Sequence, residues 1–235
     1  MAPVSLAGPL LEPLFGDPEA AAILSDAAFV DRMVSVEAAL ALACADAGLI
    51  PAAAARDIAA HLAAARPDMA VLAAGTASAG VAVPALVEML RQGLPEQTGA
   101  WLHWGATSQD IVDCAHVLQW SAMLDLLEAR LNRLLDLMQA ASLAHADTPM
   151  AARTRSQIAT PITFGLRIAQ WAQPLIGLSQ DLPQLRRRLL RVQFGGASGS
   201  GSAVDPSTAG GGLPDHVREP HRASEPLPGP RQHGL

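Results

Sequence analysis

Apolar residues recur every three or four positions through most of the chain, and this spacing predicts amphipathic helices. One apolar face runs over residues 29–44, and Gly48 follows it where a helix end favours a left-handed residue. A second predicted helix begins at Pro51, a residue suited to a first turn, and ends before Pro67. The pattern therefore predicts two helices early in the chain.

The following stretch has no clear period. Residues 69–87 carry no charge and contain glycine, threonine, serine and proline, which favour turns. We interpret this stretch as a loop that leads into a short helix over residues 84–92, closed by Gly93. The same residues argue against a membrane span, although the stretch approaches the length of one.

The strongest periodicity follows Gly105. Apolar residues stand three and four positions apart over residues 117–141, a heptad pattern that predicts one long helix over residues 108–145. Further leucines and a methionine lie outside the heptad positions, so the apolar surface is too wide for one neighbouring helix. We expect later helices of the same chain or helices of other subunits to cover the remainder.

The same spacing returns over residues 164–192, after a predicted loop at residues 146–160. Pro174 and Pro183 lie inside this second long pattern. Each lacks a backbone N–H and crowds the preceding turn. We therefore expect them to bend the helix or to break it into shorter ones.

The last segment has a different composition. Of the 41 residues from Gly195 to Leu235, 20 are glycine, proline or serine, which leaves too few apolar groups to offset the entropy lost on ordering. The chain is therefore predicted to be all-α. We expect an N-terminal helical domain at residues 1–100, part of a central helical bundle at residues 101–194 and a disordered tail at residues 195–235.

Charge, cysteine spacing and the amino-terminal residues exclude several classes of function for this chain. The net charge is −6, and basic residues gather only at residues 186–191, which argues against a nucleic-acid partner. Cys44 and Cys114 lie far apart without metal-ligand spacing, so we expect no metal, no other cofactor and no disulfide. Because the first basic residue is Arg32, we also expect no secretory signal and a cytoplasmic location.

Candidate chemistry gathers just before the long helix. Thr107 with Asp110 three residues later is typical of a helix N-cap, and this arrangement leaves the amides of Ser108 and Gln109 at a positive helix end. An anion such as a substrate carboxylate fits such a site. In the plainer alternative, Thr107 and Asp110 only cap the helix, and the nearby His103 is a hydrogen-bonded structural histidine.

Two further groups of polar residues need an explanation. Asp110 and Asp113 continue the apolar face of the long helix towards its start, so two carboxylates stand where other residues face the core and require partners. The connection between the two long patterns is rich in arginines, hydroxyls and amides, and it is either part of a site or a solvated turn. Its candidate residues are Arg153, Thr154 and Gln157.

Two segments taken together resemble a known family. The first is HWGATSQD at residues 103–110, followed by Asp113. The second, at residues 147–165, contains DTPM, an Arg-Thr pair and ATPITFG. In this order they resemble the fumarase/aspartase superfamily and, within it, the 3-carboxy-cis,cis-muconate cycloisomerases, with the adenylosuccinate lyases as near relatives. The resemblance covers about residues 10–198.

The resemblance implies an all-helical homotetramer whose central bundle pools long helices from every subunit and whose active sites combine segments of several chains. It also implies a small polycarboxylate substrate and a carbanion stabilised through a carboxylate. In the cycloisomerases, a muconate carboxylate adds across a double bond and forms a lactone, a step of aromatic catabolism in the β-ketoadipate pathway.

The resemblance also implies roles for individual residues. His103 and Ser108 are the candidate catalytic residues, and Asp110 and Asp113 are expected to position the others. The expected substrate-binding residues are Thr107, Gln109, Arg153, Thr154 and Gln157.

The chain departs from the family pattern in two places. Where the lyases carry an acid-base histidine after the Arg-Thr pair, this chain has Arg155, which argues against adenylosuccinate cleavage and favours the cycloisomerases. The family's glycine- and serine-rich loop with a catalytic serine is not found, so we expect a truncated or frame-shifted member with an incomplete site. The alternatives are an adenylosuccinate lyase-like enzyme that eliminates fumarate, and a non-catalytic helical assembly fragment.

Overall fold

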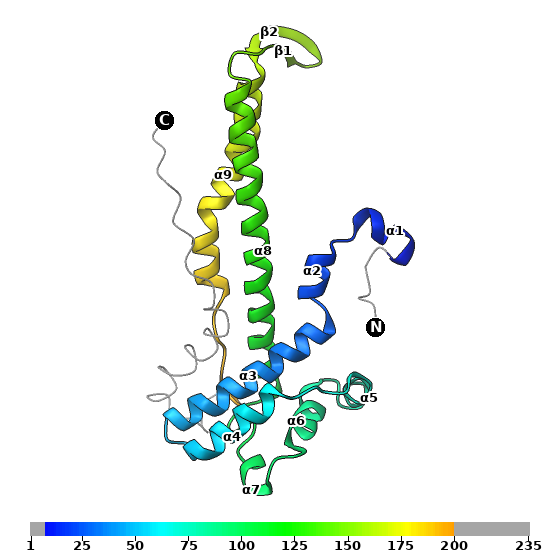
Figure 1. The fold of residues 1–235 in the computed structure, drawn as a ribbon, viewed down its shortest axis with the longest axis vertical. Coiled ribbons are helices and arrows are strands. Elements are labelled where there is room, and N and C mark those ends of the chain that lie inside the picture. The colour runs from blue at the N-terminus through cyan, green and yellow to red at the C-terminus, as the bar shows by residue number, and fades with distance from the viewer. Residues whose placement is uncertain (1–7, 200–235) are drawn as a thin grey trace. The chain divides into compact units, whose positions relative to one another are not determined.

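The computed structural model describes residues 8–199, which form mainly helices together with a single β-hairpin (Figure 1). The predicted helical fold class is confirmed. The predicted disorder of the tail lies outside the described residues from residue 200 onward. The elements in chain order are α1 (Gly8–Phe15), α2 (Pro18–Ile23), α3 (Asp26–Asp46), α4 (Ala52–Ala63), α5 (Met69–Ala79), α6 (Val83–Arg91), α7 (Glu96–Gly99), α8 (Ser108–Ala144), β1 (Pro149–Thr154), β2 (Gln157–Thr163) and α9 (Phe164–Leu189).

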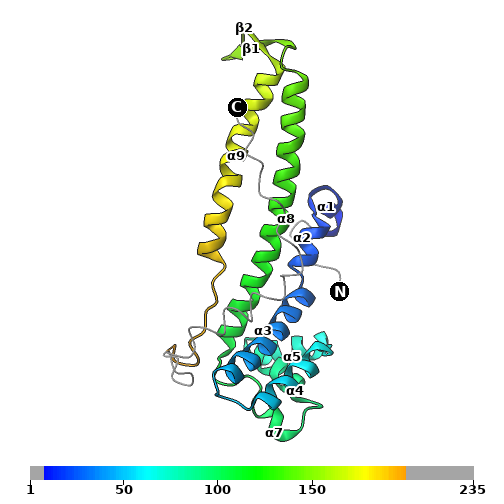
Figure 2. The same ribbon diagram turned by 60° about the vertical axis from the view of Figure 1, so that its left-hand side comes forward.

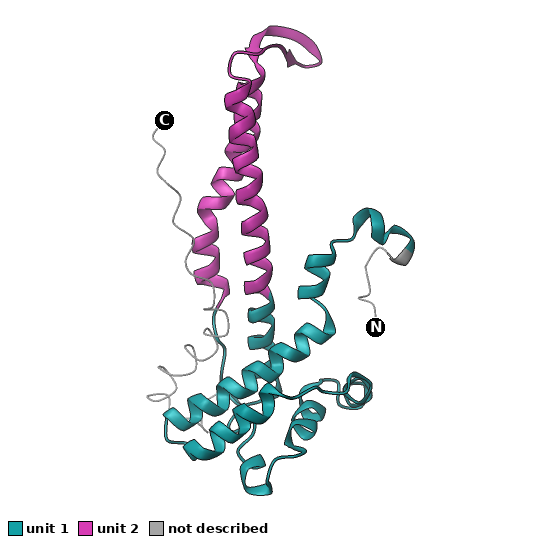
Figure 3. Ribbon diagram, viewed as in Figure 1, with its two compact units in different colours: residues 1–119, 191–235 teal, residues 120–190 magenta. Residues whose placement is uncertain are grey.

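The chain divides into two compact units (Figure 3). Unit 1 comprises Met1–Gln119 and Arg191–Leu235, and unit 2 comprises Trp120–Leu190. The first part of α8 therefore belongs to unit 1 and the remainder to unit 2. The domain boundaries expected from the sequence stay a prediction.

Unit 1 is built around α3 and α4, which lie side by side (Figure 2). Ser25 caps α3 by accepting a hydrogen bond from the amide of Ala28, and Gly48 follows the helix with a φ of 71°. Burying each large aliphatic side chain stabilises the unit by roughly 1.5–3 kcal/mol. The largest fully buried side chains include Met33, Leu40, Ile58, Leu62, Leu86, Leu102 and Ile111.

The loop expected at the start of residues 69–87 is wrong, because this part is helix α5. The short helix expected over residues 84–92 is confirmed as α6. Asp68 caps α5 by accepting from two amides, and the alanine-rich sequence of α5 has a high helix propensity. Gly75, which argued for a loop, has a packing reason instead: an added Cβ would lie 2.4 Å from the Cβ of Ala85 on α6. The glycine therefore permits the close approach of two helices.

In unit 2, α9 runs alongside the unit 2 part of α8 (Figures 1 and 2). Arg186 of α9 donates through Nη2 to Asp125 and to Glu128 of α8, at 2.7 Å each. Pro174 and Pro183 do not break the second long pattern, since α9 continues through both as one helix.

The expected loop at residues 146–160 is wrong in part, because it contains β1 and most of β2, an antiparallel pair. Arg155 and Ser156 connect the strands, and both have positive φ, 42° and 66°. Two positive φ values in a two-residue connection match the twist of a hairpin, but glycine or asparagine usually fills these positions. A hairpin could therefore not be predicted from the turn residues.

Candidate active site

Asp110 organises the amino end of α8. Its side chain is 4% exposed and accepts a hydrogen bond at 2.9 Å from the amide of Thr107, while its own amide donates to the Thr107 carbonyl. This is the carboxylate half of the predicted capping box. The negative charge also lies at the positive end of a helix of 37 residues, where it is favoured.

Asp110 also binds a segment far along the chain. The amides of Gly195 and Gly196 each donate to its carboxylate at 3.0 Å. Gly196 has a φ of 69°, and an added Cβ would lie 2.9 Å from the carbonyl oxygen of Gly105. Residues 195–199 of the expected tail are thus described and packed against the start of α8, and sequence spacing gave no sign of this contact.

A buried thiol lies one turn further along α8. Cys114 donates through Sγ to the carbonyl of Gln193 at 3.3 Å. Burial is the main cause that raises the pKa of this thiol above its ordinary value. Burial and the hydrogen bond to a backbone carbonyl are typical of a structural cysteine.

The polar side chains on the outer face of α8 pair within the helix. Gln109 donates from Nε2 to Oδ1 of Asp113 at 2.6 Å, one helical turn away. Ser108 and Thr107 are half-buried next to them. Asp113 thereby has a partner and orients the Gln109 amide, which had been expected to bind substrate.

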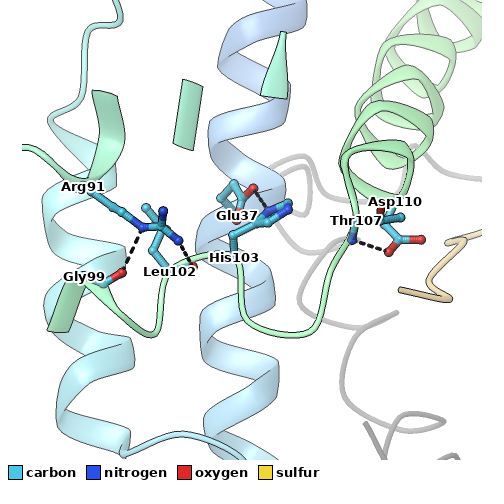
Figure 4. Close-up of polar contacts among 7 residues, drawn as sticks. All are labelled: Glu37, Arg91, Gly99, Leu102, His103, Thr107 and Asp110. Atoms are coloured by element: carbon cyan, nitrogen blue, oxygen red, sulfur yellow. Dashed lines mark hydrogen bonds and ion pairs between the residues drawn. The ribbon is translucent and has the colours of Figure 1, made fainter. Parts of the chain in front are cut away.

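His103 precedes α8 and has a partner that the sequence analysis missed. Its Nδ1 lies 2.6 Å from Oε1 of Glu37, which is fully buried on α3 (Figure 4). A signal was present in the sequence: Glu37 stands four residues after Met33 and three before Leu40, on the buried face of the helix. A carboxylate at such a position needs a partner.

The loop that carries His103 is fixed by Arg91. Its guanidinium donates from Nε to the Gly99 carbonyl and from Nη2 to the Leu102 carbonyl, both at 3.2 Å (Figure 4). The tryptophan rings of Trp101 and Trp104 also contact each other, with centroids 4.8 Å apart. The histidine therefore sits on a short loop that is held on both sides.

The other predicted site residues belong to unit 2. Arg153 pairs with Ile158 across the hairpin, and Thr154 pairs with Gln157 next to the turn. All three polar residues are exposed. His103 and residues 107–113 thus all belong to unit 1, while Arg153, Thr154 and Gln157 lie together on the hairpin of unit 2.

Comparison with known proteins shows which family the chain belongs to. A protein family described as Lyase matches residues 17–209. The chain belongs to this lyase family. The resemblance to the fumarase/aspartase superfamily that the two motifs carry is thereby confirmed.

Several named proteins are similar to most of this chain. It is 40% identical to 3-carboxy-cis,cis-muconate cycloisomerase of Bradyrhizobium diazoefficiens, covering 83% of this chain and 44% of the relative. It is 36% identical to trans-aconitate decarboxylase 1 of Mycosarcoma maydis, covering 83% and 39%. The solved structure of 3-carboxy-cis,cis-muconate lactonizing enzyme from Pseudomonas putida matches with a TM-score of 0.81 and 40% identity, covering 88% and 49%. The chain therefore spans less than half the length of these relatives.

The described part of the chain holds neither a candidate metal site nor a candidate membrane span. Within residues 8–199, no group of three or more histidine, cysteine, aspartate or glutamate side chains is arranged to hold a metal ion. None of the described helices combines the length and the apolar character that a membrane crossing requires.

Proposed function

We propose that this chain carries the carboxylate-binding part of a 3-carboxy-cis,cis-muconate cycloisomerase-type active site. The observation that carries the proposal is the 40% identity to a cycloisomerase over 83% of the chain. The geometry supports it, because the motif residues Thr107, Ser108 and Gln109 stand at the amino end of a long helix. Backbone donors and the helix dipole at such an end favour an anionic ligand.

The proposed reaction is an intramolecular addition. A carboxylate oxygen of the substrate forms a bond to one carbon of a double bond, and the neighbouring carbon receives a proton. A second carboxylate stabilises the carbanion before that proton arrives. Ser108, Thr107 and Gln109 bind substrate carboxylates by hydrogen bonds, and His103 donates to the substrate or exchanges a proton with it.

Elimination of fumarate, as in an adenylosuccinate lyase, is less well supported. The position after Arg153 and Thr154 holds Arg155, and an arginine side chain is a poor proton shuttle. Arg155 and Arg153 are both exposed on the hairpin, where a guanidinium fork suits a substrate carboxylate. The hairpin is proposed as a second group of carboxylate-binding residues.

We further propose that the chain acts in the cytoplasm, in aromatic catabolism, as a homotetramer. Unit 2 presents large apolar side chains along both of its helices, and a bundle of subunits is the arrangement that would cover them. Those on α8 include Leu127, Leu134, Leu137 and Leu143, and those on α9 include Leu166, Trp171, Ile176, Leu178 and Leu185.

The test is turnover of 3-carboxy-cis,cis-muconate by the purified chain, followed as loss of the diene absorbance. Binding of tricarballylate, a stable polycarboxylate, is measured in parallel by calorimetry. We expect Ser108→Ala to weaken binding about tenfold or more, because it removes a hydrogen bond to a charged group. Ser121→Ala on the same helix is the matched control and should bind as the parent does. A chain that forms oligomers but neither turns over the substrate nor binds a polycarboxylate would contradict the proposal. That result would support a helical assembly fragment.

A further inference from the structure

Glu37 is sealed inside unit 1. Its side chain is 0% exposed, and only one of its two carboxyl oxygens has a partner among the described residues. Oε1 lies 2.6 Å from Nδ1 of His103, and Oε2 is buried without a hydrogen bond. Among the described residues the carboxyl group therefore has one polar partner, and that partner is a predicted active-site residue.

Packing alone does not account for this residue. A buried carboxyl oxygen without a partner destabilises the folded state, whereas an aliphatic side chain of similar size is often neutral or stabilising there. The neighbours of Glu37 on the same face of α3, Met33 and Leu40, are such side chains. The role of Glu37 is therefore to be sought in what it does to His103.

His103 is held in an uncommon conformation. Its φ is 66°, in the left-handed region that few residues other than glycine adopt. The carbonyl of Leu102, the preceding residue, is fixed by Arg91, and the ring is fixed by Glu37. The side chain remains 17% exposed, so a ligand can reach it. Backbone strain of this kind persists where surrounding contacts enforce it.

We propose that Glu37 is a positioning residue for His103. Its carboxylate accepts a hydrogen bond from the N–H at Nδ1 and so fixes both the ring orientation and the tautomer. Nε2, which has no partner within residues 8–199, is then the ring atom offered to a substrate carboxylate. With Nδ1 protonated, Nε2 donates a hydrogen bond to that carboxylate in the imidazolium form, and the buried carboxylate of Glu37 balances the charge of that form. The substrate half of this proposal rests on the proposed function.

Two substitutions separate hydrogen bonding from packing. Glu37→Leu retains an apolar side chain of similar size and removes the acceptor. Glu37→Gln retains an acceptor oxygen and removes the charge. A packing role predicts that leucine is tolerated, and a positioning role predicts that glutamine is the milder change. Asp31→Asn, at an exposed position on the same helix, is the matched control.

The first readout needs no substrate. In the ¹⁵N-labelled full chain, long-range proton–nitrogen spectra report which ring nitrogen of each histidine is protonated, and His103→Gln assigns the signals. We expect His103 to carry its proton on Nδ1 in the parent, in Asp31→Asn and in Glu37→Gln. In Glu37→Leu, the His103 signals should become an average over both tautomers. Unchanged His103 signals in a folded Glu37→Leu variant would overturn the proposal.

If Glu37→Leu does not fold, the Nδ1 proton resonance of His103 in Glu37→Gln tests the proposal instead. Replacing a charged acceptor by a neutral one weakens the hydrogen bond, so the Nδ1 proton resonance should shift upfield. An unchanged resonance would overturn the proposal. The second readout is tricarballylate binding by calorimetry, where Glu37→Leu should bind at least tenfold more weakly than Asp31→Asn. A tautomer change in a chain whose parent binds no polycarboxylate supports the positioning role and contradicts only the proposed function.

Discussion

Asp110 connects three backbone amides that come from two distant parts of unit 1. It accepts from Thr107 at the start of α8 and from Gly195 and Gly196 after α9. Because the carboxylate is buried, its loss would leave these donors without a partner in a place that water reaches poorly. Asp110 therefore holds the expected carboxylate-binding end of α8 in place.

Substitution of Asp110 should destabilise the protein more than substitution of an exposed aspartate on the same helix. We expect Asp110→Ala to lower the free energy of unfolding by about 3 kcal/mol, because three hydrogen bonds to a charged acceptor are lost. Asp136→Ala, which is exposed on α8, should change it by less than about 0.5 kcal/mol. Urea denaturation of the two variants measures the difference, and equal midpoints would contradict the role of Asp110.

The fall in stability of the protein at alkaline pH should reflect the ionisation of its two buried thiols, Cys44 and Cys114. Burial raises the pKa of Cys44 from 9.0 to about 11. Above pH 9 the thiol ionises in the unfolded chain but not in the folded one, so the free energy of unfolding should fall as the pH rises towards 11. The sequence contains neither lysine nor tyrosine, which would otherwise titrate in this range.

Thermal unfolding between pH 8 and pH 11 tests this expectation. The decline should become shallower in Cys44→Ala and shallower again when Cys114 is also replaced, because burial raises the pKa of that thiol as well. A decline of equal slope in the parent and in the double variant would assign the alkaline instability to other groups.

At the scale of the element, two glycines of α9 have opposite roles. At Gly165 an added Cβ would lie 2.4 Å from the backbone oxygen of Ser142 and 2.9 Å from the backbone of Ala146. The amide of Gly165 also donates to the His145 carbonyl at 2.9 Å. Gly177 has nothing within 4 Å of such an added atom. The first glycine allows α9 to start tightly against the end of α8, and the second only lowers helix propensity.

We expect Gly165→Ala to destabilise unit 2 by about 2 kcal/mol or more, since backbone atoms must shift. Gly177→Ala should stabilise it by about 0.5–1 kcal/mol, because alanine has the higher helix propensity. Chemical denaturation followed by circular dichroism measures both changes. Two variants with the same sign would refute the assignment of the close contact to Gly165.

At the scale of the whole molecule, the apolar side chains of unit 2 are the feature that most requires a partner. Leu127 and Leu134, at heptad positions of α8, are 49% and 44% exposed, and Leu178 of α9 is 57% exposed. Heptad positions normally insert between residues of a neighbouring helix. Their exposure in one chain agrees with the proposed association of subunits.

Charges placed at these positions should prevent association. We expect the parent chain to sediment as an oligomer at micromolar concentration, and Leu127→Asp combined with Leu134→Asp to sediment as a monomer. Asn132→Asp, an exposed position on the same helix, should leave the oligomer intact. Sedimentation velocity distinguishes the species. A monomeric parent would contradict the proposed tetramer.

The sequence by itself determined the elements whose stability is local. The apolar period and Gly48 located α3, and the unbroken heptad pattern located α8 from Ser108 to Ala144. The capping pair Thr107 and Asp110 could also be predicted, because its two members are three residues apart. Of the two effects expected from the prolines inside α9, a break is wrong because the helix continues through both, and a bend stays a prediction.

Only the tertiary structure decided which distant groups meet. The contact between Glu37 and His103 joins residues 66 positions apart, and that between Asp110 and Gly196 joins residues 86 apart. Periodicity reports the conformation of neighbouring residues and carries no information on such pairs. Helix α5 and the hairpin escaped prediction for a related reason: Gly75 is explained by its approach to Ala85, and a turn through Arg155 and Ser156 has no glycine or asparagine to announce it.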